Sequence, residues 1–276
     1  MPNKLFLIFI LILSSCGSNS QHLKSDSLIN YSYLISGGNN GQYFDNGSCF
    51  IINYKDKYYL VTNFHVLTAK SPTTNKKLPN IKDTNTVVAV IFRPIHDSLI
   101  FNAFEYQLFG FDGSRNYSIS LLSNQDILDI SVLPIVIPDQ VIKHFIRIED
   151  IDSTSRDSAG VSLDIVGFPN GAFINQWQPY EIRGHSVEDT ILPPGTINVN
   201  FYFDVPTIRG MSGSPIYSIL PDGKSKLLGI SQATKEHNDS TAAKASGIYI
   251  RYALDLIKSS YNANRPSIIG KQIPSR

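Results

Sequence analysis

Short apolar runs separated by turn-forming residues are the feature that most restricts how this chain can fold. Ser48–Tyr54 and Tyr58–Thr62 are rich in β-branched and aromatic residues and flank the charged turn Lys55–Lys57, a pattern typical of a β-hairpin. Apolar residues show a helical spacing only near the C-terminus, at 252–260. The sequence therefore predicts an all-β fold of barrel type with a short C-terminal helix. Further strand-like runs lie at 87–92, 101–111, 117–122, 163–171 and 227–234.

Length and charge restrict the domain organisation and the partners. The 276 residues, 42% of them hydrophobic, suffice for one large domain or two small ones. A formal net charge of +1 and the lack of a basic stripe give no reason to expect a nucleic-acid partner. The polar stretch 139–160 is the natural linker between a first half, 36–138, and a second half, 161–260. Residues 261–276 are expected to form a polar tail.

The first 16 residues have the parts of an export signal. Lys4 precedes the apolar run Leu5–Leu13, which is too short to cross about 30 Å of hydrocarbon. Leu13-Ser14-Ser15-Cys16 resembles the lipobox of bacterial lipoproteins, which implies cleavage before Cys16 and acylation of its thiol. Since no acidic residue follows, the resemblance implies a lipid anchor in the bacterial cell envelope, at the outer membrane facing the periplasm. A plain secretory signal with an incidental cysteine is the alternative.

The chain contains two cysteines, so a lipidated Cys16 would leave Cys49 without a partner for a disulfide. Cys49 is then expected to be a buried free thiol. Residues 17–35 are mostly polar and without periodicity, and we expect a flexible tether there between anchor and folded body.

One serine lies in a tight, glycine-flanked turn between two apolar segments, within Pro206–Tyr217. A serine hydroxyl is a weak nucleophile, so it needs a base to take its proton and fixed dipoles to hold the oxyanion. Gly210 lets a substrate carbonyl approach closely, and the amides of Gly210 and Ser212 are candidate oxyanion donors. Taken alone, the motif is equally typical of an ordinary hairpin turn, so partners elsewhere in the chain decide its meaning.

His65 and Asp129 are the candidate partners. His65 follows the second strand of the predicted hairpin, and imidazole titration near neutrality suits proton transfer. Asp129 opens an apolar run that can bury its carboxylate beside an imidazole, whereas Asp126 is the second choice. His185 lacks such a strand-end setting and is expected to be a surface or packing residue.

Four stretches of the chain resemble chymotrypsin-like serine proteases of bacterial type. The hairpin 47–66 resembles their first hairpin, and Asp129-Ile-Ser-Val-Leu resembles their Asp-Ile-Ala-Leu-Leu segment. Residues 166–171 and 247–252 resemble parts of their second barrel. The order His65, Asp129, Ser212 is also that of chymotrypsin, not of subtilisins or α/β-hydrolases. The resemblance implies two six-stranded antiparallel β-barrels and a short C-terminal helix.

The resemblance also implies the site residues. His65, Asp129 and Ser212 would be the catalytic triad, with Gly210 and Ser212 forming the oxyanion hole and with no metal or organic cofactor. By the same resemblance the residue before the cut is apolar or small, since no charge stands at Pro206 or Gly247, although nearby Asp204 could reverse this preference. The substrate-binding residues would be Gln232, Ala233, Thr234 and Gly247.

The sequence thus predicts a trypsin-like serine endopeptidase that cleaves protein or peptide substrates through an acyl-enzyme intermediate. A catalytically inactive binding or scaffold lipoprotein with the same fold is the first alternative. An esterase using the same site, and a β-barrel lipoprotein with a chance resemblance, are the others. The sequence says nothing of the oligomeric state.

Overall fold

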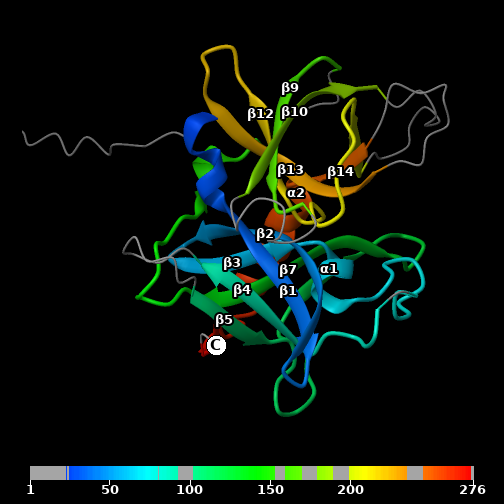
Figure 1. Ribbon diagram of the computed structural model, residues 1–276, viewed down its shortest axis with the longest axis vertical. Helices are drawn as coiled ribbons and strands as arrows, with labels where there is room; N and C mark the ends of the chain where they lie inside the picture. Colours follow the sequence, from blue (N-terminus) through cyan, green and yellow to red (C-terminus); the bar gives the residue numbers. More distant parts are fainter. Residues whose placement is uncertain are drawn as a thin grey trace, which may run out of the picture.

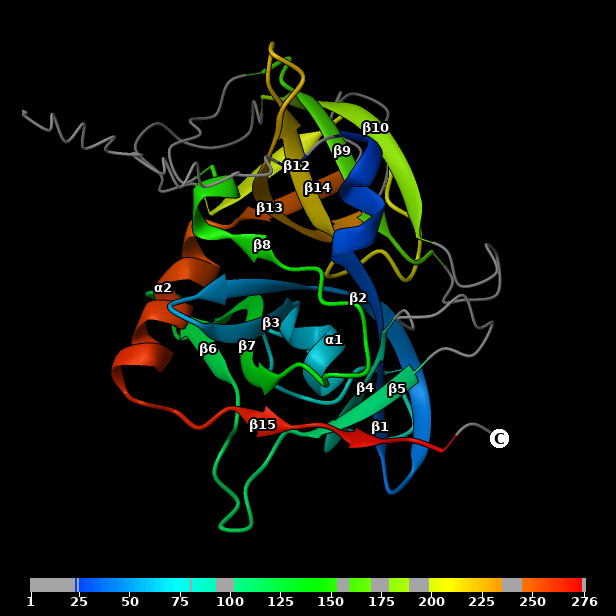
Figure 2. The same ribbon diagram turned by 90° about the vertical axis from the view of Figure 1, so that its left-hand side faces the viewer.

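The computed structural model describes residues 23, 25–79, 81–92, 102–152, 159–169, 179–188, 199–234 and 245–274. Two β-units lie one above the other, with the helix α2 (Arg251–Asn262) where they meet (Figures 1 and 2). The all-β prediction with a short C-terminal helix is confirmed. The export signal with Cys16, the tether residues 17–22 and the linker residues 153–158 lie outside the described residues.

The first unit is a ten-stranded sheet in which β7, β3, β2, β1, β4 and β5 are consecutive neighbours. Its hairpin β2–β3 is the one predicted from residues 48–62, and Phe50 pairs with Val61 across it. Alternating buried side chains of these strands fill the unit's interior. The strands are β1 (Ser32–Asn39), β2 (Gln42–Tyr54), β3 (Lys57–Thr62), β4 (Val87–Phe92), β5 (Asn102–Gln107), β6 (Ser118–Leu121), β7 (Ile127–Val136), β8 (Ile146–Arg147), β15 (Ile268–Ile269) and β16 (Lys271–Gln272).

The second unit is a closed six-stranded antiparallel barrel with the order β10-β11-β14-β13-β12-β9. Closure leaves none of these strands with an unpaired edge. Phe203, Met211 and Ile216 are among the fully buried residues of its interior. Its strands are β9 (Ser162–Gly167), β10 (Tyr180–Val187), β11 (Asn200–Phe203), β12 (Pro215–Ile219), β13 (Ser225–Thr234) and β14 (Ala245–Tyr249).

A third buried cluster joins the two units. It combines Phe50 and Val132 of the first unit with Ile230 of the second and with Ala253 and Ile257 of α2. Because packed interiors resist deformation, this shared core fixes how the facing ends of the two units meet. The remaining helical segments are η1 (Ser25–Tyr31), α1 (Phe64–Thr68) and η2 (Ile148–Asp150). Among the described residues, no helix combines the length and the apolar character needed to cross a bilayer.

The tether prediction is wrong for residues 25–35, which belong to the folded body. They form η1 and the start of β1, and Leu28 is fully buried in the shared core. Leu23 is buried there as well, and its carbonyl accepts a hydrogen bond from the Ser225 amide at 3.2 Å. Isolated leucines in a polar stretch show no periodicity, so their burial could not be read from the local pattern.

The C-terminal tail is part of the first unit. β15 pairs in parallel with β7, and β16 pairs antiparallel with β5, so the tail connects the two ends of the main strand path (Figure 2). Gly270 separates the two short strands, and a Cβ on it would lie 2.8 Å from Cζ of Tyr106. The first unit therefore has ten strands in place of the six expected, and two of the additional strands come from residues predicted only as a polar tail.

Deleting residues 268–276 should lower the free energy of unfolding by about 2 kcal/mol, because several backbone hydrogen bonds of 0.5–1.5 kcal/mol each are lost. Ending the chain at Ile273 is the control, since it keeps β15, β16 and the hydrogen bond from the Ile273 amide to the Ala103 carbonyl, 2.9 Å. Urea unfolding curves of both variants measure the difference. Equal stability of the two would show that the tail strands contribute nothing.

Candidate active site

Strand register brings His65 and Asp129 together. β3 pairs antiparallel with β7, and the last pair of this ladder is Thr62 with Ser131. His65 lies three residues beyond Thr62, in the single helical turn α1, and Asp129 lies two residues before Ser131 on the neighbouring strand. The two side chains therefore meet at the end of the ladder that faces the second unit.

The Asp129 carboxylate holds His65 with both of its oxygens. Oδ2 lies 2.8 Å from Nδ1 of the imidazole, and Oδ1 accepts the backbone amide of His65 at 3.0 Å. Asn63 donates its side-chain amide to the Asp129 carbonyl at 2.7 Å. Asp129 is 4% exposed, against 22% for the histidine side chain. A carboxylate on Nδ1 assigns the hydrogen to that nitrogen, which makes Nε2 the ring nitrogen that can act as the base.

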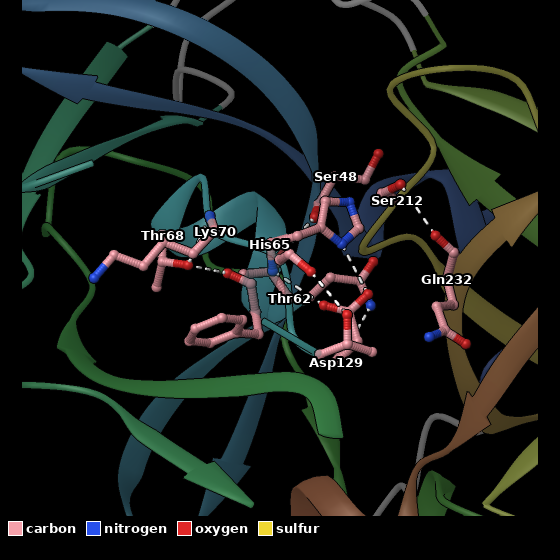
Figure 3. A network of polar contacts seen from close by, with 12 residues as sticks. Ser48, Thr62, His65, Thr68, Lys70, Asp129, Ser212 and Gln232 are labelled. Carbon is pink, nitrogen blue, oxygen red and sulfur yellow. Dashed lines mark hydrogen bonds and ion pairs between the residues drawn. The ribbon is translucent and has the colours of Figure 1, made fainter. Parts of the chain in front are cut away.

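Ser212 belongs to the second unit and lines the same pocket as His65. It lies in the turn between β11 and β12, and Figure 3 shows the His65 ring between Asp129 and Ser212. The turn depends on two glycines with left-handed backbones, Gly210 at φ 93° and Gly213 at φ 86°. A side chain on Gly213 would overlap the Ser48 carbonyl and the Thr62 hydroxyl, so the two units touch at this point.

The amides of Gly210 and Ser212 are available for an oxyanion. The hydrogen bonds recorded for the turn use the amides of Met211, Gly213 and Ser214, but in the described part of the chain none uses the amide of Gly210 or Ser212. Two such donors beside a serine hydroxyl are the arrangement that stabilises a tetrahedral oxyanion.

The Ser212 hydroxyl itself donates to the carbonyl of Gln232 at 3.2 Å. Gln232 lies at an irregularity of β13, where the register against β14 shifts between Ser231 and Ala233. Such bulges redirect one residue out of the ladder, and here the redirected carbonyl meets the serine. Because side chains exchange between staggered rotamers, rotation about Cα–Cβ can turn the hydroxyl toward His65.

Ser48 of β2 connects the serine turn to the first unit. Its amide donates to the Ser212 carbonyl at 2.8 Å, and its hydroxyl donates to the Gly210 carbonyl at 3.0 Å. The same hydroxyl accepts the Phe168 amide at 2.9 Å, while Thr62 donates to the Ser48 carbonyl at 2.8 Å. Ser48 thus holds the carbonyl of each residue whose amide is a candidate oxyanion donor, Gly210 and Ser212. In the sequence, Ser48 is distinguished only as the start of a strand-like run.

Ser48→Ala should lower both stability and turnover. The change leaves the buried Phe168 amide and Gly210 carbonyl without this partner, at about 1–3 kcal/mol for each such group. Thermal unfolding and kcat are the measurements. Ser218→Ala is the matched control, since it removes a single hydroxyl bond of 3.3 Å to the Lys226 carbonyl on β13. If both variants behaved alike, Ser48 would have no special part in holding the turn.

A pocket of about 320 Å³ opens beside His65 and Ser212. Both residues line it, together with Gly210. Its other lining residues are Val66, Leu78, Pro79, Ile81, Asn46 and Arg209. Arg209 was not predicted, because its one signal in the sequence is its place directly before Gly210.

The predicted pocket residues are only partly placed near the serine. Gln232 contacts Ser212, and the backbones of Ala233 and Thr234 continue β13 beside β14. Gly247 pairs with Ser231, but a Cβ on it would lie 2.7 Å from Phe201 and 2.8 Å from Ile216 in the barrel interior. Its Cβ side therefore faces the core, and its role in specificity stays a prediction.

The rival residues lie apart from this group. His185, with 58% of its side chain exposed, is 3.4 Å from Asp204, whose other oxygen accepts the His185 amide at 2.7 Å. Asp126 accepts from the Asn124 side chain at 2.7 Å. Asp204 is thus engaged on the barrel surface, and Asp126 belongs to the β6–β7 turn.

Cys49 is fully buried and free, and burial raises the pKa of its thiol. A thiol held in the protonated form is a poor nucleophile. Within the described ranges no three His, Cys, Asp or Glu side chains gather as metal ligands would.

Of the comparisons with known proteins, the one with solved structures bears on the fold. No protein-family model matches the chain, and no curated protein matches it by sequence. A solved structure, the crystal structure of a thermostable serine protease AL20 from an extremophilic microorganism, is similar with a TM-score of 0.50 and 12% identity. The match covers 86% of this chain and 97% of that one. The chain therefore has the fold of a serine protease.

Proposed function

We propose that this protein is a serine endopeptidase with His65, Asp129 and Ser212 as its catalytic triad. The observation that carries the proposal is the meeting of a buried carboxylate, an imidazole bonded to it at 2.8 Å, and a serine that lines one pocket with that imidazole. The three come from β7, α1 and a turn of the second barrel. The serine protease fold supports the same reading.

The roles follow from the geometry. Nε2 of His65 takes the proton of Ser212 as Oγ bonds to the acyl carbon of the substrate, and the carbonyl electron pair moves to oxygen. The amides of Gly210 and Ser212 hold that oxyanion, and Asp129 stabilises the imidazolium. The imidazolium then gives its proton to the leaving amine as the carbon–nitrogen bond breaks. Water repeats the sequence on the acyl-enzyme and releases the acid.

Peptide-library cleavage tests the proposal. The wild-type protein should generate new peptide termini, detected by mass spectrometry, and Ser212→Ala should generate none above background. The same profile identifies the residue before the cut, for which an apolar or small side chain is expected. Cleavage that persists in Ser212→Ala, or hydrolysis of esters but no peptides, would reject the peptidase assignment in favour of a contaminant or an esterase.

One observation favours the inactive binding protein as a second candidate. The Ser212 hydroxyl rests on the Gln232 carbonyl, an acceptor that does not activate it. In an inactive protein this contact would persist when substrate binds, and neither peptides nor esters would be hydrolysed. Catalytic hydrogen bonds are often long or misaligned without substrate, which is why the contact does not outweigh the triad geometry.

The proposed anchor is separate from the proposed chemistry. We infer acylation of Cys16 and attachment to the bacterial cell envelope, at the outer membrane facing the periplasm, from the lipobox-like residues 13–16. Metabolic labelling with an alkyne fatty acid should mark the wild-type protein and not Cys16→Ser, which should be released from membranes. Labelling that survives in Cys16→Ser would contradict the anchor.

A further inference from the structure

We propose that the pocket beside His65 binds the leaving-group side of the substrate, and that it selects an apolar residue directly after the cut followed by an acidic one. The inference rests on the proposed peptidase function and specifies its substrate class. It concerns the residues after the scissile bond, which no resemblance to a family addresses.

The position of the pocket assigns it to the leaving group. The imidazole must hand its proton to the departing amine, so the chain after the cut leaves the site on the His65 side. Figure 3 shows Gln232 of β13 on one side of His65 and Ser212, and on the other side Thr68, the last residue of α1, with Lys70 beyond it. The pocket is lined by His65 and Val66 of α1, together with Leu78, whose amide donates to the Ala69 carbonyl at 3.0 Å.

The lining of the pocket is apolar over most of its wall. Val66, Leu78, Pro79 and Ile81 supply it, and Val66 and Ile81 are 3% and 8% exposed. A volume of about 320 Å³ is at the lower end for ligand sites, which suits a short peptide segment. An apolar side chain placed there would be removed from water against these four residues.

The charge at the rim is positive. Arg209 lines the pocket and is exposed to solvent. In the described part of the chain no ion pair is recorded for it. No acidic residue lines the same pocket. The flanking segment 69–83 contains four lysines and one aspartate. A guanidinium that faces solvent beside a reacting centre attracts a carboxylate and can bind it with two parallel hydrogen bonds. An acidic residue next to the apolar one is the chemistry that complements this rim.

Three quenched fluorogenic peptides test the inference. They share the same sequence before the cut and carry Leu-Asp, Leu-Asn or Leu-Lys after it. For the wild type, kcat/KM should be highest for the Leu-Asp peptide, lower for Leu-Asn and lowest for Leu-Lys. Successive peptides should differ by about three- to fivefold, the size expected of an exposed ion pair.

Arg209→Glu should reverse this ranking of the peptides, and Arg209→Lys should retain it. Lys224→Glu is the control for total charge, since it also changes the charge by two units in the β12–β13 turn beside Asp222, and it should keep the wild-type ranking.

A binding arm separates this inference from the peptidase proposal. Fluorescence anisotropy of the same peptides with Ser212→Ala should show the same preference without any chemistry. If no peptide is cleaved but this preference and its reversal by Arg209→Glu remain, the peptidase assignment fails and the pocket assignment stands. If cleavage depends on Ser212 but the three peptides are equivalent, or Arg209→Glu leaves their ranking unchanged, the pocket assignment is overturned.

Discussion

Ser212→Ala is expected to reduce kcat for peptide hydrolysis by roughly 10⁴- to 10⁶-fold, the loss typical of removing a nucleophile from a triad. The fold should persist, because among the described residues the Ser212 side chain has one recorded hydrogen bond, the 3.2 Å contact to Gln232. Active-site titration of the wild type and the variant tests the expected loss of activity. Circular dichroism of the same two proteins tests whether the fold persists.

Ser214→Ala is the matched control for that experiment. Ser214 lies in the same turn, is fully buried, and has no recorded hydrogen-bond partner for its hydroxyl among the described residues. Its variant should retain kcat within a few-fold. A comparable loss in both variants would mean that the turn as a whole, and not the Ser212 hydroxyl, is what the activity requires.

Asp129→Asn should lower kcat at neutral pH by roughly 10⁴-fold, the second largest effect expected. An amide in place of the carboxylate can offer a hydrogen to Nδ1, which favours the tautomer with its hydrogen on Nε2 and removes the acceptor that Ser212 needs. The Oδ1 atom would still accept the His65 amide, now 3.0 Å away, so the local backbone should be kept.

The control for this change is Asp126→Asn, the same substitution three residues earlier. Asp126 contacts Asn124 in the β6–β7 turn, and its variant should retain full activity. Steady-state kinetics across pH 6–9 compares the two. If Asp126→Asn were the more damaging change, the buried carboxylate would not be the one that orients the histidine.

Local pattern predicted the elements whose signal lies within one segment. The run 87–92 is β4, whose residues are mostly β-branched and buried, and the helical spacing at 252–260 is α2, whose buried residues repeat with the helical period. Leu28 and the tail strand Ile268–Ile269 escaped prediction. Their partners, the shared core and β7, lie far away in the chain, so nothing in the neighbouring residues indicated them.

The candidate site also contains residues that the sequence could indicate and residues that it could not. His65, Asp129 and Ser212 could be chosen from sequence because each stands near an apolar run, and because their order resembles that of chymotrypsin-like serine proteases. The structure brings them to one place. The support around them could not be chosen in this way. Ser48 acts through hydrogen bonds to residues 162 and 120 positions away, and Gln232 meets Ser212 only because β13 shifts its register.

The most direct test of the account is the rate at which a fluorophosphonate modifies the protein, with the modified residue located by mass spectrometry. The account predicts modification of Ser212, slowed by at least about 10³-fold in His65→Ala because the base that activates the hydroxyl is gone. Modification of another residue, or equal rates in the two proteins, would contradict it.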